Sequence, residues 1–283
     1  MAGRIAVVTD STASLPVGLS DEFGVGVVPL HVVVNGVPGV EGGGVSPADV
    51  AQALADRRGT VQTSRALPED FAASFQSTMD GGAAGVVAVL MSGSLSGTYE
   101  SAVLAARQCG ESVIRVVDSR SAAMGLGFAV IAAAEAARDG GSLDQVSDAA
   151  VCLAARTTTL FYVDTLDHLR RGGRIGTAQA LLGTALSVKP ILTMSDGSIV
   201  LKEKVRTASR AVARLEALAA EAAGDAAVDI AVHHLAAAEK AVALADRLRE
   251  QVPGLRRLYS SEIGATIGAH VGPGLLGVVV ARR

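Results

Sequence analysis

The chain has 283 residues, a length that suits either one large α/β domain or two smaller ones. Hydrophobic residues make up 49% of the sequence but aromatic residues only 3%, and Trp is absent, so we expect a core built from Val, Leu, Ile and Ala. The formal net charge of -3 argues against nucleic acid as the main partner, because binding a phosphate backbone needs a basic surface.

Nothing in the sequence predicts export or a membrane span. The longest clean apolar stretch, residues 122–134, is shorter than a span, and Glu135 ends it. The N-terminus reaches Asp10 before the apolar core of a signal peptide is complete. Cys109 and Cys152 each lie in an apolar context, which favours small buried thiols in a reducing compartment over a disulfide or metal site. We therefore expect a cytoplasmic protein.

In the first half of the chain, short apolar runs alternate with helical patterns. The nearly continuous apolar runs, typical of strands buried on both faces, are Ile5–Thr9, Val25–Val33, Val86–Met91 and Val113–Val117. Helices are predicted at Pro47–Arg57, Pro68–Met79, Tyr99–Gln108 and Ala122–Arg138. This βαβ rhythm predicts an N-terminal domain, residues 1–156, with a parallel sheet between two layers of helices.

The second half predicts a mixed α/β domain, residues 157–283. Its predicted strands are Thr158–Val163, Ser187–Thr193, Ser198–Lys204, Val228–His233, Leu255–Tyr259 and Leu275–Val280. Asp196-Gly197 indicates the turn of a β-hairpin between the second and third of these strands. Ala- and Leu-rich helices are predicted at Ala208–Ala223 and Ala236–Gln251. The fold class is therefore α/β with two domains.

Four loops rich in Ser, Thr and Gly follow predicted strands. They are Asp10–Thr12, Thr63–Arg65, Ser92–Thr98 and Asp118–Ser121. Taken alone, each loop is explained as well by a turn or helix cap as by a ligand site, since Ser, Thr and Asp cap helices. Ligands of open parallel sheets bind at the carboxyl ends of the strands, so four such loops at one sheet edge favour a hydroxyl-lined pocket for an anion or carboxylate.

The glycine motifs do not match nucleotide or nucleophile sites. In Ser92–Thr98, Leu95 stands at the centre of the two glycines, where a nucleophile elbow has Ser, and no Lys precedes Thr98 as in a P-loop. Residues 272–277 match Gly-x-Gly-x-x-Gly, but the few residues that follow leave no room for a crossover helix. His270, next to this Gly-Pro-Gly turn, is the histidine we expect to be functional; we expect His31 and His168 to be structural.

Two further groups of residues have the chemistry to contact a metal or an anion. His233 and His234 are adjacent on a predicted strand and so point to opposite faces, which makes them poor ligands of one metal. In residues 170–174 (RRGGR), a helix C-terminus explains the first two arginines and the first glycine. The second glycine and Arg174 instead suggest contact with an anion or phosphate.

Taken together, these blocks resemble the DegV family along essentially the whole chain. The matching segments, in order, are VVTDSTASLP, TSRALPEDF, SGSLSGTYESA, VDSRSAAMGLGF, LDHLRRGGRIGTAQALLGTALSVKPIL, DGSIVLKEKVR and IGAHVGPGLLGVVV. Two positions depart from the family pattern: Ser92-Gly93 replaces two consecutive serines, and residues 65–67 (RAL) replace Gln-Pro-Ser.

The resemblance implies a non-catalytic protein that encloses one long-chain fatty acid between two domains and needs no cofactor. It further implies that a partner kinase subunit, which binds ATP and is related to dihydroxyacetone kinases, converts the bound acid to acyl phosphate. By this resemblance the ligand-binding residues are Thr63, Ser64, Ser92, Ser94, Ser96, His270 and Gly272. Arg174 and Arg206 would face the kinase and the phosphoryl group. Transient contact with a membrane surface is compatible with such a role.

Two other functions stay open at this point. A hydrolase acting alone through Ser96 or His270 would need an acidic residue to orient the histidine; Glu262 is nearest in sequence, and Asp10 or Asp118 would have to approach in the fold. A regulatory lipid sensor without a kinase would have the same binding residues. A search of the genome for an ATP-binding partner subunit distinguishes the sensor from the kinase subunit.

Overall fold

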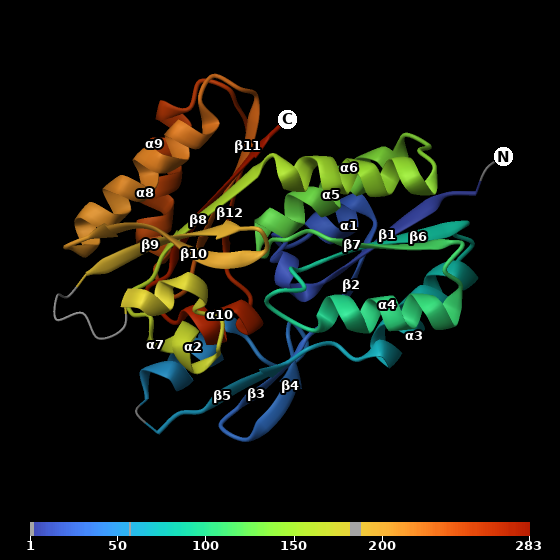
Figure 1. The fold of residues 1–283 in the computed structure, drawn as a ribbon, viewed down its shortest axis with the longest axis horizontal. Coiled ribbons are helices and arrows are strands. Elements are labelled where there is room, and N and C mark those ends of the chain that lie inside the picture. Colours follow the sequence, from blue (N-terminus) through green and yellow to red (C-terminus); the bar gives the residue numbers. More distant parts are fainter. Residues whose placement is uncertain (1–2, 57, 182–187) are drawn as a thin grey trace. The chain divides into compact units, whose positions relative to one another are not determined.

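The computed structural model describes residues 3–56, 58–181 and 188–283, and the chain forms two compact units (Figure 1). Unit 1 contains the residues up to His31 together with Ser64–Ala155. Unit 2 contains Val32–Thr63 and Arg156–Arg283. The chain therefore leaves unit 1 twice.

Unit 1 is built on a four-stranded parallel sheet of order β2-β1-β6-β7. Its strands are β1 (Ile5–Asp10), β2 (Val25–Val28), β6 (Gly85–Leu90) and β7 (Ile114–Asp118). Every residue of β6, a central strand, is buried, because helices cover both faces of the sheet. The prediction of a parallel sheet is confirmed, and three of its four predicted strands have ends that differ from the observed ones by no more than one residue.

Helices form the two outer layers of unit 1 (Figure 1). One face carries α3 (Pro68–Asp80) and α4 (Thr98–Cys109), and the other carries α1 (Leu19–Phe23), α5 (Met124–Arg138) and α6 (Leu143–Ala155). Eleven residues of α5 are buried, which explains its all-round apolar sequence. The sequence reading missed α6, although Val146, Ala150 and Leu153 are buried at helical spacing.

The predicted strand Val25–Val33 is in fact two strands. It divides into β2 and β3 (His31–Val34), which belong to different sheets. Pro29 lies in the break; its ring restricts the backbone and it has no N–H to donate to a ladder. The apolar run continues through the break because both strands are packed against cores, and so composition alone did not reveal it.

The main sheet of unit 2 has six strands in the order β10-β9-β8-β13-β11-β12. The strands are β8 (Thr157–Tyr162), β9 (Lys189–Ser195), β10 (Ser198–Val205), β11 (Val228–His234), β12 (Leu255–Glu262) and β13 (Leu276–Arg282). Only the β11–β12 pair is parallel among the described pairs of this sheet, so the predicted mixed domain is confirmed. The helices α8 (Ala208–Ala223) and α9 (Ala238–Gln251) pack on the sheet through buried Leu and Ala side chains.

The predicted hairpin between β9 and β10 is confirmed. Ser195 pairs with Ser198, and Asp196 and Gly197 between them have φ angles of 49° and 79°. Two consecutive positive φ angles are what a two-residue hairpin turn requires, and Asp-Gly tolerates them. Ser187, the predicted start of the first strand, lies outside the described residues, as does Arg57, the predicted end of a helix.

A second, three-stranded sheet of order β4-β3-β5 completes unit 2, with β4 at Val37–Val40 and β5 at Val61–Ser64. It lies with α2 (Pro47–Ala55) and α10 (Ala265–Val271) around a small core of Val32, Val45, Val50 and Ala265. This core explains why Val32–Thr63, which the sequence placed in domain 1–156, belongs to unit 2: its apolar residues pack on α10. No helix within the described residues is long and apolar enough to cross a membrane.

Candidate functional site

Thr63 and His270 are brought together within unit 2. The hydroxyl oxygen Oγ1 of Thr63, on β5, lies 2.9 Å from Nε2 of His270, on α10. The two residues are 207 positions apart in the sequence. Because both groups can donate or accept a hydrogen bond, the pair is suited to exchange its mutual bond for bonds to a ligand oxygen.

His270 stands in the last turn of α10, a helix of seven residues. The helix ends at Gly272, whose φ of 78° closes the last turn with a bond from its N–H to the carbonyl of Gly268. The sequence reading recognised the Gly-Pro-Gly turn after His270 but not the helix before it, since Ala265–Val271 contains a Gly and too few residues for a clear period.

Arg174 reaches the same region from the end of a second short helix, α7 (Asp167–Arg171). The N–H of Arg174 donates to the carbonyl of Leu169, and the N–H of Gly173 donates to that of Arg170. This is the Schellman pattern, and Gly173 has the positive φ, 71°, that the pattern needs. Gly173, the second glycine, which the sequence left unexplained, therefore ends the helix and reverses the direction of the chain. The guanidinium of Arg174 then donates to the carbonyl of Gly172.

These residues line one cavity of about 560 Å³. Its lining residues are Leu54, Gly59–Thr63, His168, Arg171, Gly172, Arg174, Ala269 and His270. No Asp or Glu is among them, whereas two arginines are, so the cavity favours an anionic ligand. His168, which we expected to be purely structural, lies in this lining; Arg171, read as a helix-end cation, lies there too.

The electrostatics of the cavity keep its histidines neutral. Burial, and to a smaller extent the positive charge of Arg174, lowers the pKa of His270 to about 4. Burial likewise lowers the pKa of His168, helped by Arg171 and opposed by Asp167. At neutral pH His270 therefore acts as a hydrogen-bonding group, and the positive charge of the cavity is carried by its arginines.

The glycines around α10 leave space for polar side chains. A Cβ on Gly172 would collide with Nδ1 of His270, and a Cβ on Gly272 would collide with the ring of His168. The lack of a side chain at Gly272 therefore allows the backbone to lie close to the ring of His168, and no nucleotide-binding role is needed to explain this glycine. The resemblance assigned Gly272 to the ligand; the structure gives it contact with a cavity histidine.

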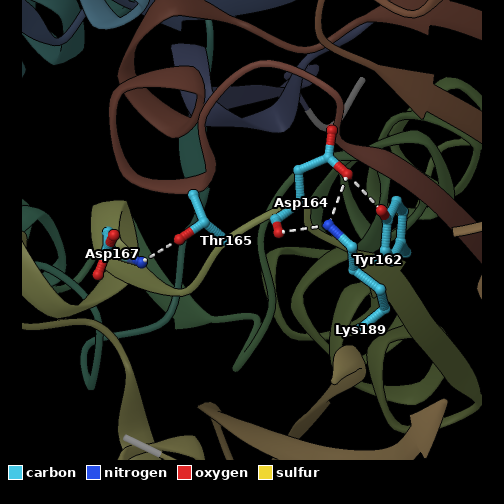
Figure 2. Close-up of polar contacts among 5 residues, drawn as sticks. All are labelled: Tyr162, Asp164, Thr165, Asp167 and Lys189. Atoms are coloured by element: carbon cyan, nitrogen blue, oxygen red, sulfur yellow. Dashed lines mark hydrogen bonds and ion pairs between the residues drawn. The ribbon is translucent and has the colours of Figure 1, made fainter. Parts of the chain in front are cut away.

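A polar cluster of Tyr162, Asp164 and Lys189 lies beside the turn that follows α10, and Figure 2 shows the contacts within it. Asp164 accepts a hydrogen bond from the buried Tyr162, and Lys189 donates to the backbone and carboxylate oxygens of Asp164 at 2.9 and 3.3 Å. The carboxylate of Asp164 also lies against Gly274, where a Cβ would strike it. Burial and the Asp164 hydrogen bond raise the pKa of Tyr162, so the phenol stays a donor. Sequence reasoning missed this cluster, whose members carry no motif.

Three of the four Ser/Thr-rich loops share one edge of the unit 1 sheet. Asp10 accepts from the N–H of Met91, Asp118 accepts from the N–H of Gly93 at 3.3 Å, and the N–H of Ser92 donates to the carbonyl of Ser121. The fourth loop was predicted wrongly. Thr63 and Ser64 are the last residues of β5, which pairs with β3 in the separate three-stranded sheet and not with the parallel sheet.

The serines of the second loop have distinct surroundings. Ser92 is buried, and its hydroxyl accepts from the N–H of Ser94, which itself is exposed. Ser96 lies 2.9 Å from the hydroxyl of Thr98 at the start of α4. These bonds are those of a turn and a helix start, as the cap interpretation expected. Arg65, one of the departures from the family pattern, extends its guanidinium to Gly97 of this loop.

The other predicted site residues lie on the surface. Ser64 is exposed at the end of β5, and Arg206 is exposed directly after β10. Neither belongs to the lining of the 560 Å³ cavity. Arg174 is half-buried within it, so the two arginines that the resemblance grouped together have different environments.

The acids proposed to orient His270 have other partners. Glu262 accepts from the N–H of Ala236 at 3.2 Å, and Asp10 accepts from the N–H of Thr12 at 2.9 Å. Asp118 accepts from the N–H of Arg120 at 2.7 Å. The side chain that hydrogen-bonds to His270 is that of Thr63, which does not provide the charge that a hydrolytic triad uses. In the described parts of the chain, no three His, Cys, Asp or Glu side chains gather as a metal site would require.

Comparison with known proteins gives a consistent relationship over the full length. A DegV domain-containing protein from Streptomyces coelicolor is 55% identical over 283 residues, 100% of both chains. One from Mycobacterium tuberculosis is 40% identical over 277 residues, 98% of this chain and 96% of the relative.

Two solved structures have the same fold at moderate identity. A DegV family protein from Thermus thermophilus, described as fatty acid binding, is 33% identical with a TM-score of 0.92 and covers 99% of this chain and 100% of its own. DegV from Bacillus subtilis, described as a fatty acid binding protein, is 30% identical with a TM-score of 0.90 and the same coverage. A model of the DegV family, whose members are described as uncharacterised proteins, matches residues 4–283. The chain belongs to the DegV family.

Proposed function

We propose that this protein binds a long-chain fatty acid and that Thr63 and His270 hold its carboxylate. The observation that carries the proposal is the 2.9 Å contact between Thr63 Oγ1 and His270 Nε2 in a cavity whose described lining residues include two arginines and no acid. The relatives from Thermus thermophilus and Bacillus subtilis, which are described as fatty acid binding, support the ligand class.

The chemistry of a carboxylate explains why these two residues are suitable. A carboxylate that leaves water must regain hydrogen-bond donors, or its burial is heavily penalised. The Thr63 hydroxyl and the neutral imidazole of His270 are two neighbouring donors for its two oxygens. Ser64, Ser92, Ser94, Ser96 and Gly272 remain predicted ligand residues; of the four serines, Ser64 and Ser94 are exposed.

The acyl chain supplies most of the binding free energy. Burying a methylene group gains about 0.8 kcal/mol, so a palmitate-sized chain gains on the order of 10 kcal/mol before ordering costs. A sequence with 49% hydrophobic and only 3% aromatic residues provides flexible aliphatic side chains to line such a chain. The head group then determines orientation, and the tail determines affinity.

The protein itself is proposed to be non-catalytic, the lipid-binding subunit of a two-component fatty acid kinase in the cytoplasm. In this role an ATP-binding subunit, related to dihydroxyacetone kinases, phosphorylates the carboxylate that His270 presents. Arg174, half-buried at the cavity, and Arg206, exposed after β10, would stabilise the transferred phosphoryl group at the partner interface. Guanidinium groups suit this task because they bind phosphate oxygens in pairs.

Two measurements test the proposal. Native mass spectrometry of the purified protein, followed by lipid extraction, should reveal one bound long-chain fatty acid. After lipid removal, His270→Asn should weaken fatty acid binding by at least about tenfold, the effect of one hydrogen bond to a charged group.

The kinase role has its own test. Arg174→Ala should keep fatty acid affinity within a few fold but abolish acyl phosphate formation by the ATP-binding subunit. Equal losses of lipid affinity in the His270 and Arg174 variants would contradict this division of roles. Binding without phosphorylation by any kinase subunit of the same genome would instead identify a lipid sensor.

A further inference from the structure

The helix that carries His270 is attached at its first turn by a distant carboxylate. Glu41, which follows β4, accepts hydrogen bonds from the backbone N–H of Thr266 at 3.1 Å and from the Thr266 hydroxyl at 2.8 Å. Thr266 is the second residue of α10 and only 5% exposed. The two partners are 225 positions apart. Glu41 therefore satisfies helix N–H and hydroxyl groups that would otherwise lose hydration on burial.

Glu41 takes the place of the N-cap side chain that α10 lacks. The N-cap position is Gly264, which has extended backbone angles suited to a cap but no side chain to accept a bond. A Cβ on Gly264 would collide with the carboxylate of Glu41. The local cap and the distant carboxylate therefore exclude each other, and the chain uses the distant one. A negative charge at this end also complements the helix dipole.

The same small sheet also holds the other end of α10. Glu41 follows β4 and Thr63 lies on β5, and these are the two edge strands of the order β4-β3-β5. Glu41 contacts the first turn of the helix and Thr63 contacts His270 in the last turn. Thr266 and His270 are four residues apart, about 6 Å along a helix, so they lie on one face. A helix of seven residues that is hydrogen-bonded to the sheet at both its first and its last turn has little freedom to tilt.

We propose that Glu41 is a positioning residue for His270, one that sets the direction of the imidazole in the cavity by fixing the start of α10. The expected effect of Glu41 on fatty acid affinity rests on the function proposed above. The structural part of the proposal concerns the ring of His270 in the ligand-free protein. Loss of the cap should let α10 shift, and the Thr63–His270 contact should then lengthen or break.

The test uses a reciprocal rescue. Glu41→Ala should move the ring nitrogen NMR signals of His270 in lipid-free protein and weaken fatty acid binding by about fivefold to tenfold, the size of a lost helix cap. Gly264→Ser alone should have a similar effect, because its side chain meets Glu41. The double variant should recover both measurements, since the serine can then cap α10 locally. Glu41→Gln, which keeps one acceptor, should fall between.

Thr207→Ala is the matched control, because the Thr207 hydroxyl caps α8, in the same unit but outside the cavity lining. If Glu41→Ala or Glu41→Gln moves the His270 signals no more than Thr207→Ala does, the positioning role is wrong. If the double variant fails to recover the signals, the cap argument is wrong. If the signals move and recover while fatty acid affinity stays constant, Glu41 does position His270, and the role of His270 in carboxylate binding is wrong.

Discussion

Replacement of Thr63 by Val tests the carboxylate site with almost no change in shape. Both side chains are β-branched, so the strand preference of β5 is preserved and only the hydroxyl is lost. That loss removes the 2.9 Å partner of His270 Nε2 and one donor to the carboxylate. A hydrogen bond to a charged group contributes about 1.5–3 kcal/mol, so affinity should fall roughly tenfold to a hundredfold.

Titration calorimetry of lipid-free protein with palmitate measures this loss directly. Thr60→Val is the matched control: Thr60 lines the same cavity just before β5, and its backbone N–H and carbonyl both bind Asn35. The control should bind within about twofold of the unchanged protein. Equal affinities of the Thr63 and Thr60 variants would refute the assignment of the carboxylate to the Thr63–His270 pair.

Three further predictions concern stability and the packing around the site. In the fold, burial lowers the pKa of His233 to about 4, so the unfolded chain takes up a proton first as pH falls from about 6.5. The free energy of unfolding should therefore fall as the pH is lowered from 6.5 to 4. In denaturant titrations, His233→Asn should reduce that fall by on the order of 3 kcal/mol, and a pH profile unchanged by the substitution would disprove this. Gly172→Ala should cost about 1–3 kcal/mol in the same assay and move the His270 NMR signals, because the new Cβ meets that ring; full stability would show the contact to be adaptable. Tyr162→Phe should cost about 0.5–1.5 kcal/mol by removing the hydrogen bond to Asp164, and a neutral result would mean that Asp164 finds another donor.

Local sequence patterns predicted most of the regular structure correctly. Buried runs such as β6 and the Asp-Gly hairpin turn are determined by residues that are adjacent in the chain, so their signals are strong. The break at Pro29 and the short helix α10 were missed, because an apolar run hides the first and seven residues are too few to establish a period in the second.

The sequence by itself determined the fold class, the family and the residue types suited to a carboxylate, since these follow from composition and contiguous motifs. Only the tertiary structure decided that Val32–Thr63 joins the C-terminal unit, which brings Thr63 and Glu41 to α10 across more than 200 positions. The physical reason is that these partners meet through the packing of a small apolar core around Val32, Val50 and Ala265. The local sequence shows that these residues are apolar, but it does not show which distant segment they will pack against.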